Sequence, residues 1–202
     1  MYYDEKTAAR IFIALLNAVD GNKERLKKSW IDSAGRMCVC DGFRAYRLNT
    51  PIAGVPDQEA GSAPDLDKVF PATLADYKPL NLPTLAEIKA MQEEDKRAKK
   101  RGETVSNVFT FGADENGQQL PAVNINYLAD TLQIFPDVIA YYTKPTSPIV
   151  FKDKNGDAIL LPIRISGGSS IDPMKRRTVT VQPKNDKVPA FGLRTFAAIY
   201  AP

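Results

Sequence analysis

The chain has 202 residues, 44% of them apolar and 25% charged, and a formal net charge of +3. These values are ordinary for a soluble globular protein of one large or two small domains. The absence of histidine excludes Ser-His and Cys-His nucleophilic systems and histidine zinc sites. The chain lacks an apolar run of about eighteen residues and a signal-peptide pattern, so we expect a cytoplasmic protein with no membrane partner.

The first fifty residues predict a helix followed by three strands. Apolar residues recur at helical spacing over residues 4–19, Asp4 is a suitable N-cap, and Gly21 follows the end of this pattern. The strands are expected at 26–32, 36–40 and 43–48, with turns at 33–35 and at Asp41-Gly42.

Two cysteines lie on the second of these strands. Cys38 and Cys40 are two residues apart, so both side chains point to one face. They are too few for a zinc site, and a disulfide between them would need awkward geometry. We interpret them as small apolar side chains in a reducing compartment.

The middle of the chain predicts a loop and then one long helix. Residues 51–64 are rich in Pro, Gly and Ala. Thr84 and Glu87 have the spacing of a capping box, which predicts a helix that runs to about Arg101. Its apolar stripe reaches only its midpoint, so the charged second half is expected to project into solvent.

The second half of the chain predicts a further helix and a group of strands. Asn126 is expected to cap a helix that extends to Phe135. Asn155-Gly156 predicts a hairpin with a type I′ turn, because both residues tolerate positive φ angles. The strands are expected at 108–111, 138–143, 148–152 and 158–165.

Three segments, taken in order, resemble the bacterial DNA polymerase sliding clamp (beta subunit) family. Residues 36–48 resemble its Thr-Asp-Gly-His-Arg-Leu turn, with Cys40 in place of Thr and Phe43 in place of His. Residues 123–132 resemble its Asn-x-x-Tyr-Leu-x-Asp-x-Leu helix, and 158–165 resemble its closing Met-Pro-Met-Arg-Leu strand. The order of the three carries the resemblance.

The resemblance implies an α+β, DNA-clamp-like fold, in which helices pack on antiparallel sheets built from βαβββ-type half-domains. We expect a clamp-like domain over residues 1–165, with 53–120 either an insertion or the remnant of a second domain. Residues 166–202 are expected to form a C-terminal extension. Its final apolar stretch, 191–200, is too hydrophobic to remain in solvent and should pack on the body or on a neighbour.

The resemblance also implies a pocket that captures short peptides from replication proteins. A small apolar pocket with a cation at its rim can hold an apolar anchor and fix a carboxylate or carbonyl. The alternative for Arg44 is a solvated residue of a hairpin turn. The matching positions are Phe43, Arg44, Ala45, Pro71, Leu160, Leu161 and Pro162.

Basic residues in three places are candidates for contact with double-stranded DNA. Phosphate contact needs no base-reading residues, so the binding would be independent of sequence. The alternative for the long helix is a solvated end whose cations suit the helix dipole, and the tail cluster has the same two interpretations. The candidates are Lys6, Arg10, Lys96, Arg97, Lys99, Lys100, Arg101, Lys175, Arg176 and Arg177.

The resemblance implies a non-catalytic, sliding-clamp-like protein of DNA replication that assembles with copies of itself around DNA, docks polymerase-type peptides, or does both. The chain carries about one full domain, so a ring would need more subunits than usual. The first alternative is a monomeric binding module that keeps the peptide pocket without encircling DNA. The second is a small enzyme, which the lack of histidine and of any phosphate-cradling loop disfavours. No cofactor or metal is expected.

Overall fold

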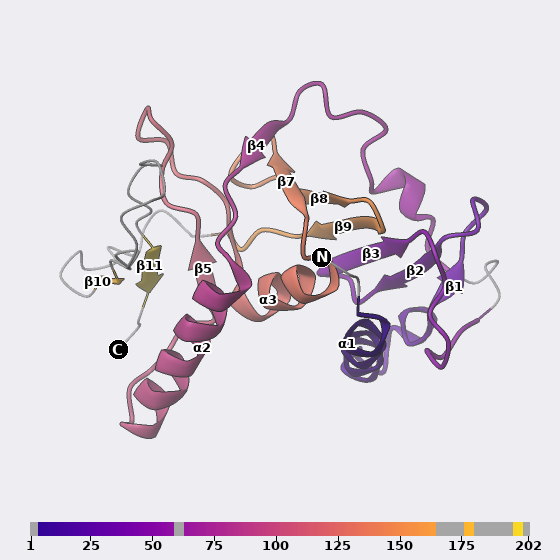
Figure 1. Cartoon of the computed structure of the whole chain (residues 1–202), viewed down its shortest axis with the longest axis horizontal. Coiled ribbons are helices and arrows are strands. Elements are labelled where there is room, and N and C mark those ends of the chain that lie inside the picture. Colours follow the sequence, from indigo (N-terminus) through magenta and orange to yellow (C-terminus); the bar gives the residue numbers. More distant parts are fainter. Residues whose placement is uncertain (1–3, 59–62, 165–175, 180–195, 200–202) are drawn as a thin grey trace.

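The computed structural model describes residues 4–58, 63–164, 176–179 and 196–199. Its centre is a seven-stranded antiparallel sheet with the order β1-β2-β3-β9-β8-β7-β4 (Figure 1). Strands from the two halves of the chain meet in the middle of this sheet, where β3 pairs with β9 from Arg44↔Leu160 to Leu48↔Gly156. The N-terminal and C-terminal halves therefore form one structure.

Among the described residues, three helices are separated along the chain by groups of short strands. The helices are α1 (Glu5–Asn17), α2 (Leu85–Lys100) and α3 (Ile125–Ile134), with 3-10 turns η1 (Glu24–Leu26) and η3 (Leu66–Lys68). The strands are β1 (Trp30–Ile31), β2 (Met37–Cys40), β3 (Arg44–Leu48), β4 (Lys78–Leu80), β5 (Val108–Thr110), β6 (Ala122–Asn124), β7 (Ile139–Tyr142), β8 (Ile149–Asp153), β9 (Gly156–Leu160), β10 (Arg176–Val179) and β11 (Phe196–Ile199).

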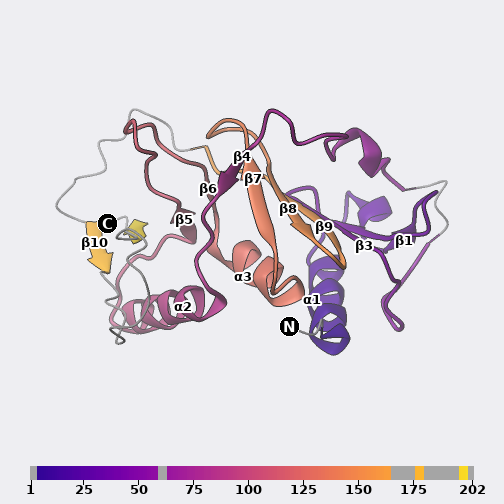
Figure 2. The same cartoon turned by 45° about the horizontal axis from the view of Figure 1, so that its top comes forward.

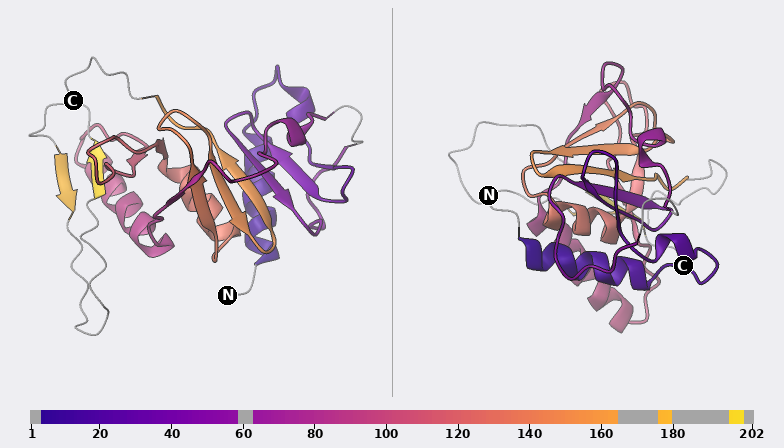
Figure 3. Two further views of the ribbon diagram at one scale, coloured as in Figure 1. Left: turned by 90° about the horizontal axis from the view of Figure 1, so that it is seen from above. Right: turned by 90° about the vertical axis from the view of Figure 1, so that its right-hand side faces the viewer.

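Helices α1 and α3 cover one face of the seven-stranded sheet (Figures 1 and 3). Alternate residues of the strands point toward these helices, as the two-residue period of a strand requires. Tyr46 of β3 lies at the centre, with its ring 5.3 Å from Phe12 of α1 and 6.4 Å from Phe135, which follows α3. All three side chains are fully buried, so this layer is the main core.

The opposite face of the sheet carries a second, smaller core. Cys38, Ala45 and Ile159 point to this side and pack with Leu66 and Phe70 from the segment between β3 and β4. That segment crosses from the β1 end of the sheet to the β4 edge (Figure 1). Residues from the region 53–120, predicted to be an insertion or the remnant of a second domain, therefore cover the outer face of the sheet.

A four-stranded sheet with the order β10-β11-β5-β6 lies beside α2 (Figure 2). Strand β11 pairs with β5, so part of the apolar C-terminal stretch lies on the body of the protein, as expected. The order β6-α3-β7-β8-β9 is a complete βαβββ unit, which confirms the expected half-domain. Within the described residues, no helix combines the length and the apolar character needed to cross a membrane.

Several local predictions are confirmed. The Asp4 side chain accepts a hydrogen bond from the Lys6 backbone N–H at the start of α1. Thr84 and Glu87 form the complete capping box of α2, with the Thr84 N–H donating to Glu87 Oε2 at 2.7 Å. Cys38 and Cys40 share the outer face of the sheet, and both thiols are free.

The predicted strand at 26–32 is wrong at its start. Residues 24–26 form the 3-10 turn η1, and only Trp30 and Ile31 pair with β2. Leu26 is buried and Lys27 and Lys28 follow it, so the apolar alternation that indicates a strand is confined to a few residues. Packing of Leu26 determines the local conformation instead.

Two predictions of detail are also corrected. The cap of α3 is Asn124 rather than Asn126, because the Asn124 side chain accepts from the Asn126 N–H at 2.9 Å while Ile125 is buried as the first helical residue. The hairpin at 154–155 forms without a type I′ turn, since no non-glycine residue among those described has a positive φ. Gly156 is needed for a different reason: a Cβ there would lie 2.1 Å from the Arg47 carbonyl oxygen.

Candidate functional site: the Asp41–Arg44 turn

The turn at Asp41-Gly42 is held by the carboxylate of its first residue. Asp41 Oδ1 accepts from the backbone N–H groups of Phe43 and Arg44 at 2.8 and 2.9 Å. Gly42 adopts a φ of 91°, a left-handed conformation that favours glycine. This local geometry presents Phe43 outward, where 54% of the residue is exposed, and turns Arg44 inward.

Arg44 is a buried arginine whose guanidinium contacts two carboxylates and an aromatic ring. Its Nε donates to Asp41 Oδ2 at 3.0 Å and its Nη1 donates to Asp130 of α3 at 2.5 Å. The guanidinium also lies 4.2 Å from the ring centroid of Tyr127, a cation–π contact. Burial alone would lower the pKa of Arg44, but the nearby Tyr46, Asp130 and Asp41 raise it above its ordinary value.

The three segments that resemble the clamp family meet at this point. The turn contributes Arg44, and the helix motif contributes its own Tyr and Asp, Tyr127 and Asp130, which contact that arginine. The closing strand contributes Leu161, whose backbone N–H donates to the Phe43 carbonyl oxygen at 2.9 Å. The ordered motifs of the sequence are therefore one packed unit in space.

The structure separates the predicted pocket residues into three environments. Arg44 and Leu160 are paired across β3 and β9 and are buried on the helix-facing side, whereas Ala45 is buried on the outer face. Pro71 is half-buried and directly follows Phe70 of the outer cluster. The residues that are accessible together are Phe43, Leu161 at 41% exposure, and the half-buried Pro162.

Lys23 is a neighbour of this surface that the sequence analysis did not single out. Its exposed side chain places Nζ 5.2 Å from the centroid of the Phe43 ring. A Cβ on Gly42 would lie 3.2 Å from the same nitrogen. Lys23 falls between the predicted helix at 4–19 and the predicted strand at 26–32, in a stretch for which the sequence predicts no element or site.

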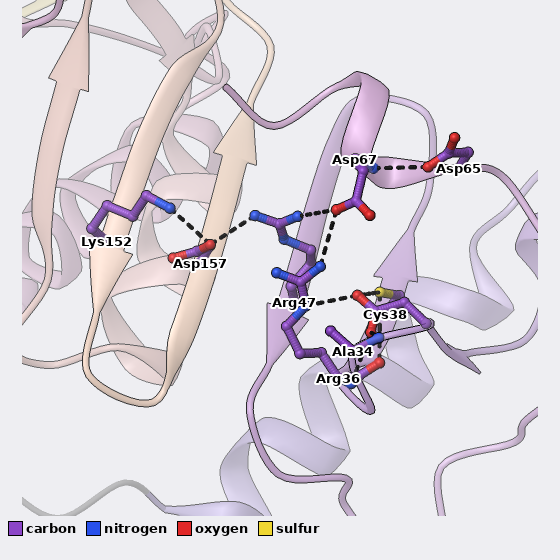
Figure 4. A network of polar contacts seen from close by, with 9 residues as sticks. Ala34, Arg36, Cys38, Arg47, Asp65, Asp67, Lys152 and Asp157 are labelled. Atoms are coloured by element: carbon purple, nitrogen blue, oxygen red, sulfur yellow. Dashed lines mark hydrogen bonds and ion pairs between the residues drawn. The ribbon is translucent and has the colours of Figure 1, made fainter. Parts of the chain in front are cut away.

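A second ionic cluster lies on the outer face of the sheet (Figure 4). Arg47 Nη1 and Nη2 donate to Asp67 and Asp157, each at 2.8 Å. Asp67 also accepts from Arg36 at 3.0 Å, and Asp157 pairs with Lys152 at 2.8 Å. The Arg47 guanidinium lies 3.8 Å from the Phe70 ring centroid, so the cluster fixes the segment between β3 and β4 on the sheet.

The predicted DNA-contact residues lie on two helices and in the tail. Lys6 and Arg10 are exposed on α1, and the basic run of α2 is exposed on the part of that helix that extends away from the sheet (Figure 1). Within that run Lys96 pairs with Glu93 at 2.7 Å, and Arg101 pairs with Glu94 and Glu103. Lys175 lies outside the described residues, and only the backbone of Arg176 and Arg177 is described.

The exposed cations on these helices can attract an anion. The Cys38 thiol lies 3.7 Å from Asp32 Oδ2 beside the Arg47 cluster (Figure 4), and burial raises the pKa of this thiol to about 12, so it stays protonated near neutral pH. In the described part of the chain, no three or more Cys, Asp or Glu side chains gather in a way that could hold a metal ion.

Comparison with solved structures shows the same fold in bacterial sliding clamps. The beta sliding clamp of C. crescentus matches with a TM-score of 0.52 at 14% identity, over 80% of this chain and 63% of the clamp. A DNA polymerase III beta subunit of Eubacterium rectale matches with a TM-score of 0.50 at 12% identity, over 81% of this chain and 65% of that protein. The clamp-like α+β fold is therefore confirmed. No family model and no curated protein matches the sequence.

The chain spans a little less than two thirds of the length of these two proteins. At this level of identity the similarity is one of fold. The function of this chain therefore depends on the residues of its own site.

Proposed function

We propose that this protein is a non-catalytic, sliding-clamp-like factor of DNA replication that assembles with further copies of itself around double-stranded DNA. The observation that carries this proposal is the convergence of the three motifs on Arg44 within a clamp fold. In this proposal several copies close around the duplex with closed symmetry.

The DNA contact in this proposal is made by exposed cations on α1 and α2, with the tail cluster as a further candidate. Lys6 and Arg10 lie on a helix that covers one face of the sheet, and Lys99 and Lys100 are exposed on α2. Contacts of this kind neutralise phosphates without reading bases. Binding should therefore be independent of sequence and should weaken steeply with salt.

The surface formed by Phe43 and Leu161 supports a second role, the docking of short peptides from replication proteins. Two large apolar side chains are exposed next to each other at the ends of β3 and β9, joined by a backbone hydrogen bond. Exposed apolar groups in contact with one another are typical of partner sites. A monomeric module with this docking surface alone is the alternative to a ring.

Light scattering over a concentration series tests the assembly step. The proposal predicts one discrete oligomer whose mass is constant once it has formed, as closed symmetry requires. A monomer at every concentration, with and without duplex DNA, would refute self-assembly and leave the docking module as the function.

A further inference from the structure

The cation available beside Phe43 is Lys23. Arg44 is only 8% exposed in its side chain, and its guanidinium is paired with two carboxylates and lies over the Tyr127 ring, so it is poorly accessible to a ligand. Lys23, in contrast, is exposed and lies over the Phe43 ring. The sequence analysis placed the rim cation at Arg44, whereas the geometry gives that position to Lys23.

The fold holds Lys23 at this place. Its carbonyl oxygen accepts from the Leu26 N–H at 2.8 Å, and Leu26 is buried. Gln58 donates from its side chain to the carbonyl oxygen of Arg25 at 2.8 Å, which fixes the same turn. The turn at 23–28 carries Lys23, Arg25, Lys27 and Lys28 against a single acid, Glu24, so the segment that holds Lys23 is predominantly positive.

We propose that Phe43, Leu161 and Lys23 bind a peptide segment in which an apolar side chain lies next to a carboxylate, and that Lys23 selects the carboxylate. This inference rests on the docking role proposed above. The apolar pair receives the side chain, while the flexible ammonium of Lys23 can leave the Phe43 ring and pair with the acid. The positive turn at 23–28 provides the charge complementarity.

A protein partner fits this surface better than a nucleic acid strand. Single strands are bound on series of aromatic side chains, whereas Phe43 is the one exposed aromatic side chain among the described residues, so successive bases could not stack beside its ring. The groups beside that ring, Leu161 and Pro162, are aliphatic and suit an apolar side chain. A single strand is therefore a competitor that the test must include.

The test uses the full-length chain and two fluorescein-labelled peptides, Ser-Glu-Leu-Asp-Phe-Glu-Ser and its neutral counterpart Ser-Gln-Leu-Asn-Phe-Gln-Ser. At low ionic strength, anisotropy titration should give about fivefold tighter binding of the acidic peptide, the upper range for an exposed ion pair. Lys23→Gln should reduce this preference to about twofold or less and leave the neutral peptide unchanged. Lys89→Gln, which removes an exposed cation on α2, is the matched control and should retain the preference.

Each other outcome contradicts a specific part of the proposal. An acidic preference that survives Lys23→Gln would show that Lys23 is not the selecting residue. Equal binding of both peptides by the unmodified chain would refute selection while leaving the docking role intact. Binding of neither peptide, or binding unchanged by Phe43→Ser, would refute docking at this surface as well. Displacement of the acidic peptide by oligothymidylate, with Lys23→Gln weakening the oligonucleotide instead, would replace the peptide with a nucleic acid.

Discussion

Strand β3 carries two buried arginines that face opposite sides of the sheet and have the same kinds of contact partner. Arg44 and Arg47 each contact two carboxylates and one aromatic ring, and their side chains are 8% and 7% exposed. Their partners differ. Arg44 reaches Asp130 on the core helix α3, whereas Arg47 reaches Asp67, which is 59% exposed, on the segment between β3 and β4.

Because their partners differ, the two arginines stabilise different parts of the protein. The Arg44 cluster joins the turn at 41–44 to the core helix α3. The Arg47 cluster attaches a segment that this chain places over the outer face of its sheet, and both of its carboxylates have a second cation, Arg36 or Lys152. The same chemistry therefore joins the sheet to α3 in one case and holds the segment between β3 and β4 on the sheet in the other.

The largest expected effect is that of Arg44→Ala. It leaves the largely buried carboxylates of Asp41 and Asp130 without their guanidinium, and breaking a buried pair in this way costs about 3–5 kcal/mol. Urea denaturation should show the loss in the free energy of unfolding. Arg44→Lys, which keeps the charge without the planar fork, should be intermediate. A loss below about 1 kcal/mol would contradict the role given to Arg44.

Arg47→Ala should cost less, about 1–3 kcal/mol, because Asp67 keeps Arg36 and Asp157 keeps Lys152. Its specific effect should be loosening of the segment at 63–77, detected as faster amide hydrogen exchange there than in α3. Equal losses for Arg47→Ala and Arg44→Ala, with no local change in exchange, would remove the distinction between the two clusters.

Alkaline pH should destabilise both faces of the sheet. Burial raises the pKa of Tyr46 to about 12 and that of Cys38 to about 12. Both groups stay protonated in the folded chain while the unfolded chain ionises, so stability is complete below the ordinary pKa values and falls as pH rises from about 9 to 12. Tyr46→Phe should remove the tyrosine part of this fall, at most about 3 kcal/mol. A pH-independent free energy of unfolding over this window would contradict the prediction.

The smallest effect on stability is expected at Lys96, whose ion pair with Glu93 is exposed on both sides. Lys96→Gln should leave the unfolding midpoint unchanged, because exposed pairs contribute little. It should instead lower the slope of log affinity for duplex DNA against log salt by about 0.9, the value for one phosphate contact. An unchanged slope would show that Lys96 does not contact DNA.

Local signals in the sequence predicted much of the fold. The Thr84–Glu87 capping box and the helical spacing after Asp4 are each contained in a few neighbouring residues, and both predicted helices are present. The error at Asn126 has a simple cause: two asparagines stand two apart, and burial of Ile125 decides that Asn124 is the cap. Propensity alone does not distinguish them.

The candidate site was predicted only in part, because its contacts join distant residues. Asp130 is 86 positions from Arg44, and Asp67 is 20 from Arg47. One signal was present: Tyr127 and Asp130 are three apart in the helix motif and therefore share a face, which predicts a common partner. No spacing rule connects Lys23 with Phe43, since that contact depends on the buried Leu26 and the close approach at Gly42.

The retention of the protein on nicked circular DNA, before and after the circle is linearised, tests the proposed encirclement most directly. A closed assembly that surrounds the duplex can leave only over an end, so we predict that the protein remains bound to the circle in high salt and is lost when the circle is cut. Equal rates of loss from circular and linear DNA would contradict encirclement, whatever the affinity for DNA.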